Sequence, residues 1–176
     1  MDEVTLAYLA GLLDADGYFT IKRNTYHVRI RGDARCPMFN ERIGLKQTRP
    51  EGVALLHSLF GGYRNIQRGY SRHTKLLHGW QVTDAAAAKV AQAMLPFLRL
   101  KRQQAGLIIA LRRHKGLGRM RLRQPDGTTF PWRHWTGKTI QMRRFVMRPE
   151  AVAYRQALFE RVKTLNDTRP RQAKLG

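Results

Sequence analysis

The chain has 176 residues, 43% of them hydrophobic, and 33 Lys and Arg against 12 Asp and Glu give it a net charge of +21. So basic a surface attracts polyanions and predicts nucleic acid as the partner, with a membrane surface as the weaker alternative. Its apolar runs are too short to span a bilayer, the acidic start Met1 to Glu3 is no signal peptide, and Cys36 stands alone. We therefore expect one soluble, intracellular domain, residues 1–176, without disulfides or a cysteine zinc site.

Hydrophobic periodicity and turn signals predict a helix, two strands, a helix, two strands and a helix in the first hundred residues. The expected ranges are 4–16, 18–31, 39–48, 51–60, 63–68, 75–83 and 84–95. Thr48 to Glu51 has capping-box spacing, Gly61-Gly62 ends the second helix, and Thr83 or Asp84 can cap the third. This order is an approximate repeat and indicates an α+β fold.

Two further helices are expected, from about Pro96 to Arg113 and from Glu150 to Leu165. Residues 114–148 between them mix basic residues with glycine and tryptophan, and we interpret them as a basic insertion with short strands. The stretch 99–148 carries fourteen Arg and Lys and a single acid, Asp126. That balance favours an extension of the nucleic-acid contact over a basic tether without a fixed role.

The first helix has two non-polar sides. One consists of Leu6, Leu9 and Leu13. The other, made of small residues and one acid, consists of Ala7, Ala10, Gly11 and Asp14. A domain core uses one face of a helix, and small residues let another backbone come close, so the second side predicts a partner helix in a dimer. A fully buried helix in a monomer is the alternative.

Asp14 and Asp16 stand at the C-terminal end of this helix, which Gly17 is expected to cap. A carboxylate is unfavourable there by roughly 0.3–1 kcal/mol, because the helix dipole is negative at that end. A hard divalent cation would compensate and would suit phosphoryl transfer. The alternative is that the acids and the glycine form only a turn.

The stretch Leu9 to Gly17 reads LAGLLDADG and resembles the defining motif of the LAGLIDADG homing endonucleases, with Leu13 where isoleucine is usual. The resemblance extends to the order of elements, the region of Gln47, residues 96–105 and residues 165–167. It implies a saddle of antiparallel strands over double-stranded DNA, with the motif helices at the central interface. Only one motif is present, since Arg112 and Arg113 follow the similar stretch 105–111. Single-motif members are homodimers that read pseudo-palindromic sites.

The resemblance also implies intron homing through a metal-dependent double-strand break that leaves short 3′ overhangs. Asp16 and the Ala15 carbonyl would hold Mg²⁺, for which Mn²⁺ would substitute. Gln47 would help to hold the nucleophilic water, Lys101 would supply positive charge beside the phosphate, and Asp14 would brace or cap the helix interface. Similar enzymes carry a further basic residue shortly after the glutamine, and the sequence leaves open whether Arg49 takes that role.

The DNA-reading surface is expected on the strand face opposite the core. Odd-numbered positions point inward at the start of the first strand and even-numbered positions further along, so a bulge is expected near Asn24-Thr25. The inward positions are Phe19, Ile21, Tyr26, Val28, Ile30, Ile43, Leu45, Ile66, Trp80 and Val82. Outward amides suit base edges, and basic residues suit phosphates and guanine. The predicted DNA contacts are Lys22, Asn24, His27, Arg29, Arg31, Arg42, Lys46, Asn65, Gln67, Arg68, Arg72, Lys75 and Gln81.

Two other functions use the same fold. An intron maturase would bind structured RNA, and a DNA-binding regulator would have lost cleavage. Asp16, Gln47 and Lys101 favour the nuclease, because a binder needs no carboxylate directed at a phosphate. The sequence does not distinguish a bacterial cytoplasm from an organelle, or an intron from an intein.

Overall fold

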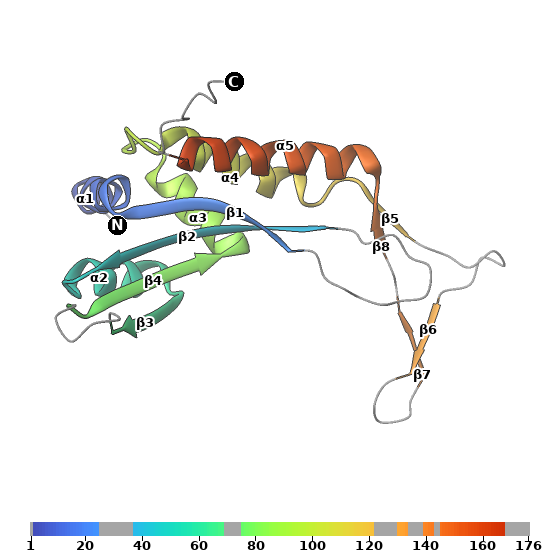
Figure 1. Cartoon of the computed structure of the whole chain (residues 1–176), viewed down its shortest axis with the longest axis horizontal. Coiled ribbons are helices and arrows are strands. Elements are labelled where there is room, and N and C mark those ends of the chain that lie inside the picture. The colour runs from blue at the N-terminus through green and yellow to red at the C-terminus, as the bar shows by residue number, and fades with distance from the viewer. Residues whose placement is uncertain are drawn as a thin grey trace, which may run out of the picture.

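The computed structural model describes residues 2–24, 37–68, 75–121, 130–133, 139–142 and 145–167. The first part of the chain follows the predicted order (Figure 1). Its elements are α1 (Glu3–Ala15), β1 (Gly17–Asn24), β2 (Met38–Gln47), α2 (Glu51–Phe60), β3 (Tyr63–Gln67), β4 (Leu77–Thr83) and α3 (Asp84–Met94). The remaining elements are α4 (Arg102–His114), β5 (Arg119–Arg121), β6 (Phe130–Arg133), β7 (Thr139–Met142), β8 (Phe145–Met147) and α5 (Pro149–Asn166).

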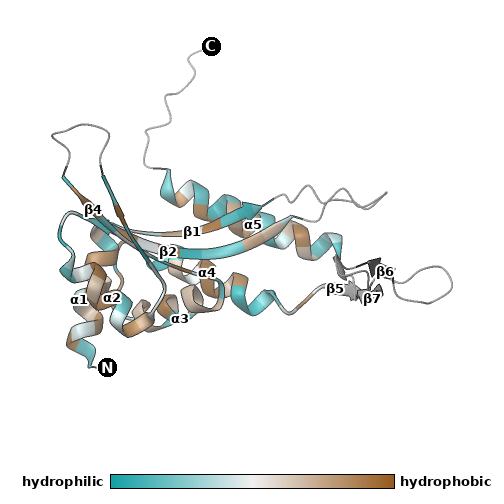
Figure 2. Cartoon of the chain, turned by 90° about the horizontal axis from the view of Figure 1, so that it is seen from below, coloured by the Kyte–Doolittle hydropathy of each residue, from teal (hydrophilic) through white to brown (hydrophobic). Residues whose placement is uncertain are grey.

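The first four strands form one antiparallel sheet in the order β1-β2-β4-β3. Helices α1 to α4 lie along one side of it, and we call the other side the open face (Figure 2). The predicted α+β class is therefore confirmed, as are short strands within residues 114–148, where β5 pairs with β8 and β6 with β7. Among the described residues, no helix combines the length and hydropathy of a membrane span.

The core lies between the sheet and these helices. The alternation predicted for the described strands holds for Phe19, Ile21, Ile43, Leu45, Trp80 and Val82, which are at most 2% exposed. Leu9 and Leu13 of α1 are fully buried with them, and the indole N–H of Trp80 donates to the Gly61 carbonyl at 2.7 Å. Alanines of α3 bring this helix close to α4 across the same core. One apolar side of α1 thus packs inside the subunit.

Ile66 is the exception among the inward positions. It lies opposite His78 and so shares the face of Trp80, yet it is 64% exposed. The prediction of a buried Ile66 is wrong because β3 is the edge strand and its end reaches beyond the helices. Alternation along a strand predicts which face of the sheet a side chain lies on, but not whether the helices cover that part of the face.

Several helix ends differ from the sequence expectation. Pro50, not Thr48, is the N-cap of α2 and makes no side-chain capping bond, so the capping box does not form. Thr83 is the N-cap of α3, also without such a bond. Helix α4 begins at Arg102 rather than near Pro96, because the amides of Phe97 and Leu98 bond back to Met94 and end α3 with a turn.

Gly17 is not a helix cap either. Asp16 is the C-cap of α1 in a right-handed conformation, and Gly17 is the first residue of β1. A Cβ added at Gly17 would lie 2.7 Å from the Leu13 carbonyl oxygen and 2.8 Å from the Leu13 side chain. The glycine is therefore required by the close approach of strand and helix, which leaves Asp16 at their junction.

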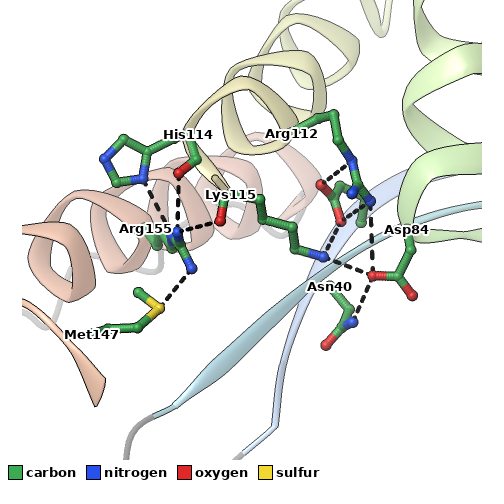
Figure 3. A network of polar contacts seen from close by, with 8 residues as sticks. Asn40, Asp84, Arg112, His114, Lys115, Met147 and Arg155 are labelled. Atoms are coloured by element: carbon green, nitrogen blue, oxygen red, sulfur yellow. Dashed lines mark hydrogen bonds and ion pairs between the residues drawn. The ribbon is translucent and has the colours of Figure 1, made fainter. Parts of the chain in front are cut away.

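A buried acid joins the sheet to α4. Glu41 of β2 is fully buried, with its carboxylate 3.1 Å from the Arg112 guanidinium and 2.6 Å from the Lys115 ammonium. Lys115 and Asn40 also donate to Asp84, each at 2.7 Å (Figure 3). Burial alone would raise the pKa of Asp84, but these bonds and the charges of Lys115 and Arg112 hold it below its usual value.

A buried arginine fixes α5 to the end of α4. Arg155 is 4% exposed, and its guanidinium donates to the carbonyl oxygens of His114 and Lys115 at 3.0 and 3.2 Å (Figure 3). It also donates to the carbonyl oxygen of Leu117 at 3.1 Å. Burial and this positive charge lower the pKa of His114, whose Nδ1 accepts from Arg155. At its other end, α5 contacts β1 through Asn166, which donates to the Phe19 carbonyl at 2.9 Å. The last helix thus closes the free edge of β1.

Candidate active site and nucleic-acid interface

The C-terminal end of α1 meets the last residue of β2. The Gln47 amide Nε2 donates to Oδ2 of Asp16 at 2.9 Å, although the two residues are 31 positions apart in the chain. Asp16 is exposed and Gln47 is half-buried. The structure therefore brings together the two side chains to which the family resemblance gives the metal and the attacking water, and the amide N–H holds the carboxylate.

Lys101 reaches the same helix end. Its ammonium donates to the carbonyl oxygens of Leu13, Asp14 and Ala15 at 2.9, 2.5 and 3.2 Å. Burial lowers the pKa of Lys101, while the charges of Asp14 and Asp16 act in the opposite direction. In the structure, the Lys101 ammonium therefore compensates part of the negative charge at this end of the helix dipole.

Asp14 completes a reciprocal contact between α1 and the start of α4. Its carboxylate accepts from the backbone amides of Arg99, Leu100 and Lys101 at 2.7, 3.2 and 2.9 Å. The acid thereby fixes the segment that carries Lys101, and the lysine caps the helix that carries the acid. Asp14 stabilises the fold of its own chain in this way, and its place at a dimer interface stays a prediction.

Ala10 was predicted to face a partner helix, and that prediction is wrong. Ala10 is fully buried in the core of its own subunit, beside Leu9 and Leu13. Ala7 and Gly11 are exposed, and with Val4 (80% exposed) and Tyr8 (54% exposed) they form an apolar strip along α1. Helical spacing could have identified Val4 and Tyr8, because they lie three or four residues from Ala7 and Gly11.

A groove opens beside Asp16, between α1, the end of β2 and the start of α2. It is lined by Tyr8, Leu12, Asp16, Lys46, Gln47, Thr48, Arg49, Glu51, Gly52 and Leu77. Arg49 therefore lies in the same groove as Asp16 and Gln47. Lys46 and Leu77 point to the open face of the sheet, so the groove leads from the acid to that face.

The oxygen atoms at this junction fit a hard divalent cation only in part. Asp16 offers an exposed carboxylate and Ala15 a carbonyl oxygen, which are ligands that Mg²⁺ prefers. No group of three or more His, Cys, Asp and Glu side chains gathers anywhere in the described part of the chain. One chain therefore offers one carboxylate and one carbonyl oxygen to a divalent cation at this junction.

The open face gathers most of the predicted DNA contacts. Strand register places on it Lys22, Asn24, Arg42, Lys46, Asn65, Gln67 and Gln81. Arg68 and Lys75 follow and precede strands and are exposed. His27, Arg29, Arg31 and Arg72, the inward positions Tyr26, Val28 and Ile30, and the bulge expected after Asn24 lie outside the described residues. Sequence reasoning missed Tyr18, Thr20 and Tyr63 on this face, although Tyr18 and Thr20 alternate in step with Lys22.

Gly52 makes room for the Gln47 side chain. A Cβ at this buried position of α2 would lie 2.8 Å from Gln47 Oε1 and 2.8 Å from the Leu12 side chain. We expect Gly52→Ala to displace the amide from Asp16 and, under the nuclease function proposed below, to slow DNA cleavage about 10- to 100-fold, because shifts near 1 Å at a catalytic group cost that much. Single-turnover cleavage rates would measure this loss.

Gly106→Ala is the matched control, since this glycine also lies inside a helix and a Cβ there would meet nothing within 4 Å. That variant should cleave as the parent does and gain about 0.5–1 kcal/mol of stability from helix propensity. Equal cleavage by Gly52→Ala and Gly106→Ala would contradict the positioning of Gln47 by Gly52.

No protein-family model and no curated protein matches the sequence. Among solved structures, the homing endonuclease I-CvuI in complex with the I-CreI target aligns with a TM-score of 0.62 and 16% identity, over 96% of this chain and 86% of that one. The archaeal intron-encoded homing endonuclease I-Vdi141I, complexed with DNA, aligns with a TM-score of 0.61 and 10% identity, over 98% of this chain and 90% of that one. The homing endonuclease I-TnaI aligns with a TM-score of 0.51 and 11% identity, over 91% of this chain and 94% of that one. This chain therefore has the fold of the LAGLIDADG homing endonucleases.

Proposed function

We propose that the protein is a homing-type DNA endonuclease. Two copies would pair through α1 and cut both strands of a long pseudo-palindromic duplex by metal-dependent hydrolysis, leaving short 3′ overhangs. The observation that carries this proposal is the convergence of Asp16, Gln47 and Lys101 at the end of α1, beside a basic open sheet face. The DNA complexes of I-CvuI and I-Vdi141I, which share the fold, support it.

The exposed strip of α1 supports the dimer. Val4, Ala7, Tyr8 and Gly11 present apolar surface to solvent, and a Cβ at Gly11 would meet nothing within 4 Å. A second α1 can therefore approach closely at that position. A twofold axis through this strip would bring the Asp16 of each subunit together and match a two-fold DNA site. The whole chain would act as one domain, with residues 114–148 extending the DNA contact.

The chemistry follows from the donors at the junction. Asp16 and the Ala15 carbonyl would hold Mg²⁺, with Mn²⁺ as a substitute, and the ion when bound neutralises phosphate charge and lowers the pKa of a water. Gln47 orients the Asp16 carboxylate through its amide N–H and keeps its own carbonyl oxygen available to a water. Lys101 holds a positive charge next to Ala15, where the phosphate would lie.

Incubation with a randomised plasmid library, with Mg²⁺ in one arm and EDTA in the other, tests the proposal. We expect linear product only in the Mg²⁺ arm, and pseudo-palindromic sequences at the recovered ends. Duplex binding without cleavage in Mg²⁺ or Mn²⁺ would instead indicate a regulator. Preference for structured RNA over duplex DNA would indicate a maturase. Either result would overturn the nuclease.

A further inference from the structure

Two amide side chains on the open face have their oxygen atoms occupied by donors of the protein, and a third has its oxygen atom against a glycine. We propose that these three amides of β3 and β4 therefore form a donor-only reading surface that selects guanine in the major groove and rejects adenine and cytosine. The inference rests on the proposed function, because it takes the open face as the side that meets the duplex. It concerns Gln67, Gln81 and Asn65, together with the residues that orient them.

The amide of Gln67 is oriented by a lysine. The ammonium of Lys46 donates to Gln67 Oε1 at 2.9 Å. A lysine side chain has donors only, so the oxygen of the amide must face it. The Gln67 Nε2, with its two hydrogens, then points away from Lys46 and is available to a base.

The amide of Gln81 is oriented by a tyrosine. The hydroxyl of Tyr18 donates to Gln81 Oε1 at 3.0 Å. Its ring lies across Gly44, where an added Cβ would collide with the Tyr18 hydroxyl and ring. Burial raises the pKa of Tyr18, with the Arg42 charge acting against it, so the hydroxyl keeps its proton at neutral pH and can donate.

Asn65 shows the same orientation by a different route. Its partner in the register is Gly79, and Asn65 Oδ1 is the atom nearest to a Cβ placed on that glycine. The amide thus lies against the glycine with its oxygen toward the strand. Glycine at 44 and at 79 leaves room for a neighbouring side chain to lie on the sheet, the Tyr18 ring at Gly44 and the Asn65 amide at Gly79.

In the described part of the chain, the charged side chains around these amides are hydrogen-bond donors, and none of them is an acidic acceptor. Lys22, Arg42 and Lys46 lie on the same face, and register places no Asp or Glu of the described residues there. Guanine presents two acceptors in the major groove, N7 and O6. Adenine and cytosine each present an amino group, which needs an acceptor from the protein. A glutamine whose oxygen is occupied loses the paired contact with adenine but keeps its donors for guanine.

The test compares the base preferences of the parent protein with those of Tyr18→Phe and Lys46→Met. DNA is recovered from one random duplex library both as bound complexes in EDTA and as cleaved products in Mg²⁺. We expect guanine to exceed adenine about tenfold at two positions of each half-site in the parent. Tyr18→Phe should raise adenine about tenfold at one position, and Lys46→Met should do so at the other, because each frees one amide oxygen.

Tyr63→Phe is the matched control, since it removes a hydroxyl from the same face that bonds to no described residue. It should leave the position that responds to Tyr18→Phe unchanged. The inference would be overturned if the parent protein preferred adenine or cytosine at the half-site positions whose base preference changes in Tyr18→Phe or Lys46→Met. Unchanged preferences in Tyr18→Phe and Lys46→Met, or the same gain of adenine in Tyr63→Phe, would overturn it too. Binding without cleavage would contradict only the proposed function, and absence of duplex binding would overturn both.

Discussion

Asp16→Asn is expected to reduce DNA cleavage by at least about 10³-fold, because the metal's stabilisation of the transition state is worth several kcal/mol and each factor of ten needs 1.36 kcal/mol. The asparagine keeps the size of the side chain and an oxygen that can still accept from Gln47, so the junction should keep its shape. DNA affinity should stay near that of the parent, since Asp16 lies outside the open face.

Single-turnover cleavage in Mg²⁺ and a binding titration in Ca²⁺ would measure the two effects separately. Asp2→Asn is the matched control, because it makes the same chemical change at the other end of α1. There Asp2 is the N-cap and accepts from the Thr5 amide at 2.8 Å, a role that asparagine fills equally well. Cleavage by Asp16→Asn at the rate of Asp2→Asn would remove this carboxylate from the chemistry.

Glu41→Ala is expected to lower the free energy of unfolding by about 3 kcal/mol, since removing one partner of a buried ion pair leaves uncompensated charge. Glu41 is fully buried, whereas the side chains of Arg112 and Lys115 are 30% and 17% exposed. The two cations would therefore lose their buried anion and keep only Asp84, whose side chain is 47% exposed. Urea unfolding followed by circular dichroism would measure the change.

Glu160→Ala provides the comparison for that measurement. Glu160 is an exposed acid of α5 whose carboxylate accepts from Gln156 at 2.7 Å, and exposed substitutions of this kind usually change stability by no more than about 0.5 kcal/mol. If Glu41→Ala lowered the free energy of unfolding by no more than Glu160→Ala does, the buried acid would not be what holds α4 on the sheet.

The sequence predicts the parts of the site that local rules determine. The motif indicated Asp16, and its resemblance assigned Gln47 and Lys101, which the fold brings to one helix end. Strand alternation gave the correct side for Asn65, Gln67 and Gln81, because side chains alternate strictly along a strand. Alternation also put Glu41 on the inward side with Ile43, so a buried acid could have been found there.

Other features depend on what lies across space, and no local pattern contains them. Both sides of α1 are non-polar, so a helical wheel could not tell that Ala10 faces the core while Ala7 faces solvent. Ile66 has the parity of a core residue, but its exposure depends on where the helix layer ends. The amides that Asp14 binds belong to a turn far along the chain, and only the folded structure shows them.

The glycines of the sheet determine how the proposed DNA target could be changed. The Tyr18 ring rests on Gly44 to reach Gln81, and Asn65 rests on Gly79 next to Lys46 in the register. A side chain introduced at Gly44 would displace Tyr18 and with it the orientation of Gln81, and one introduced at Gly79 would displace Asn65. To change the target sequence, residues that lie opposite one another on neighbouring strands should therefore be substituted together. Gly44 and Gly79 should be kept.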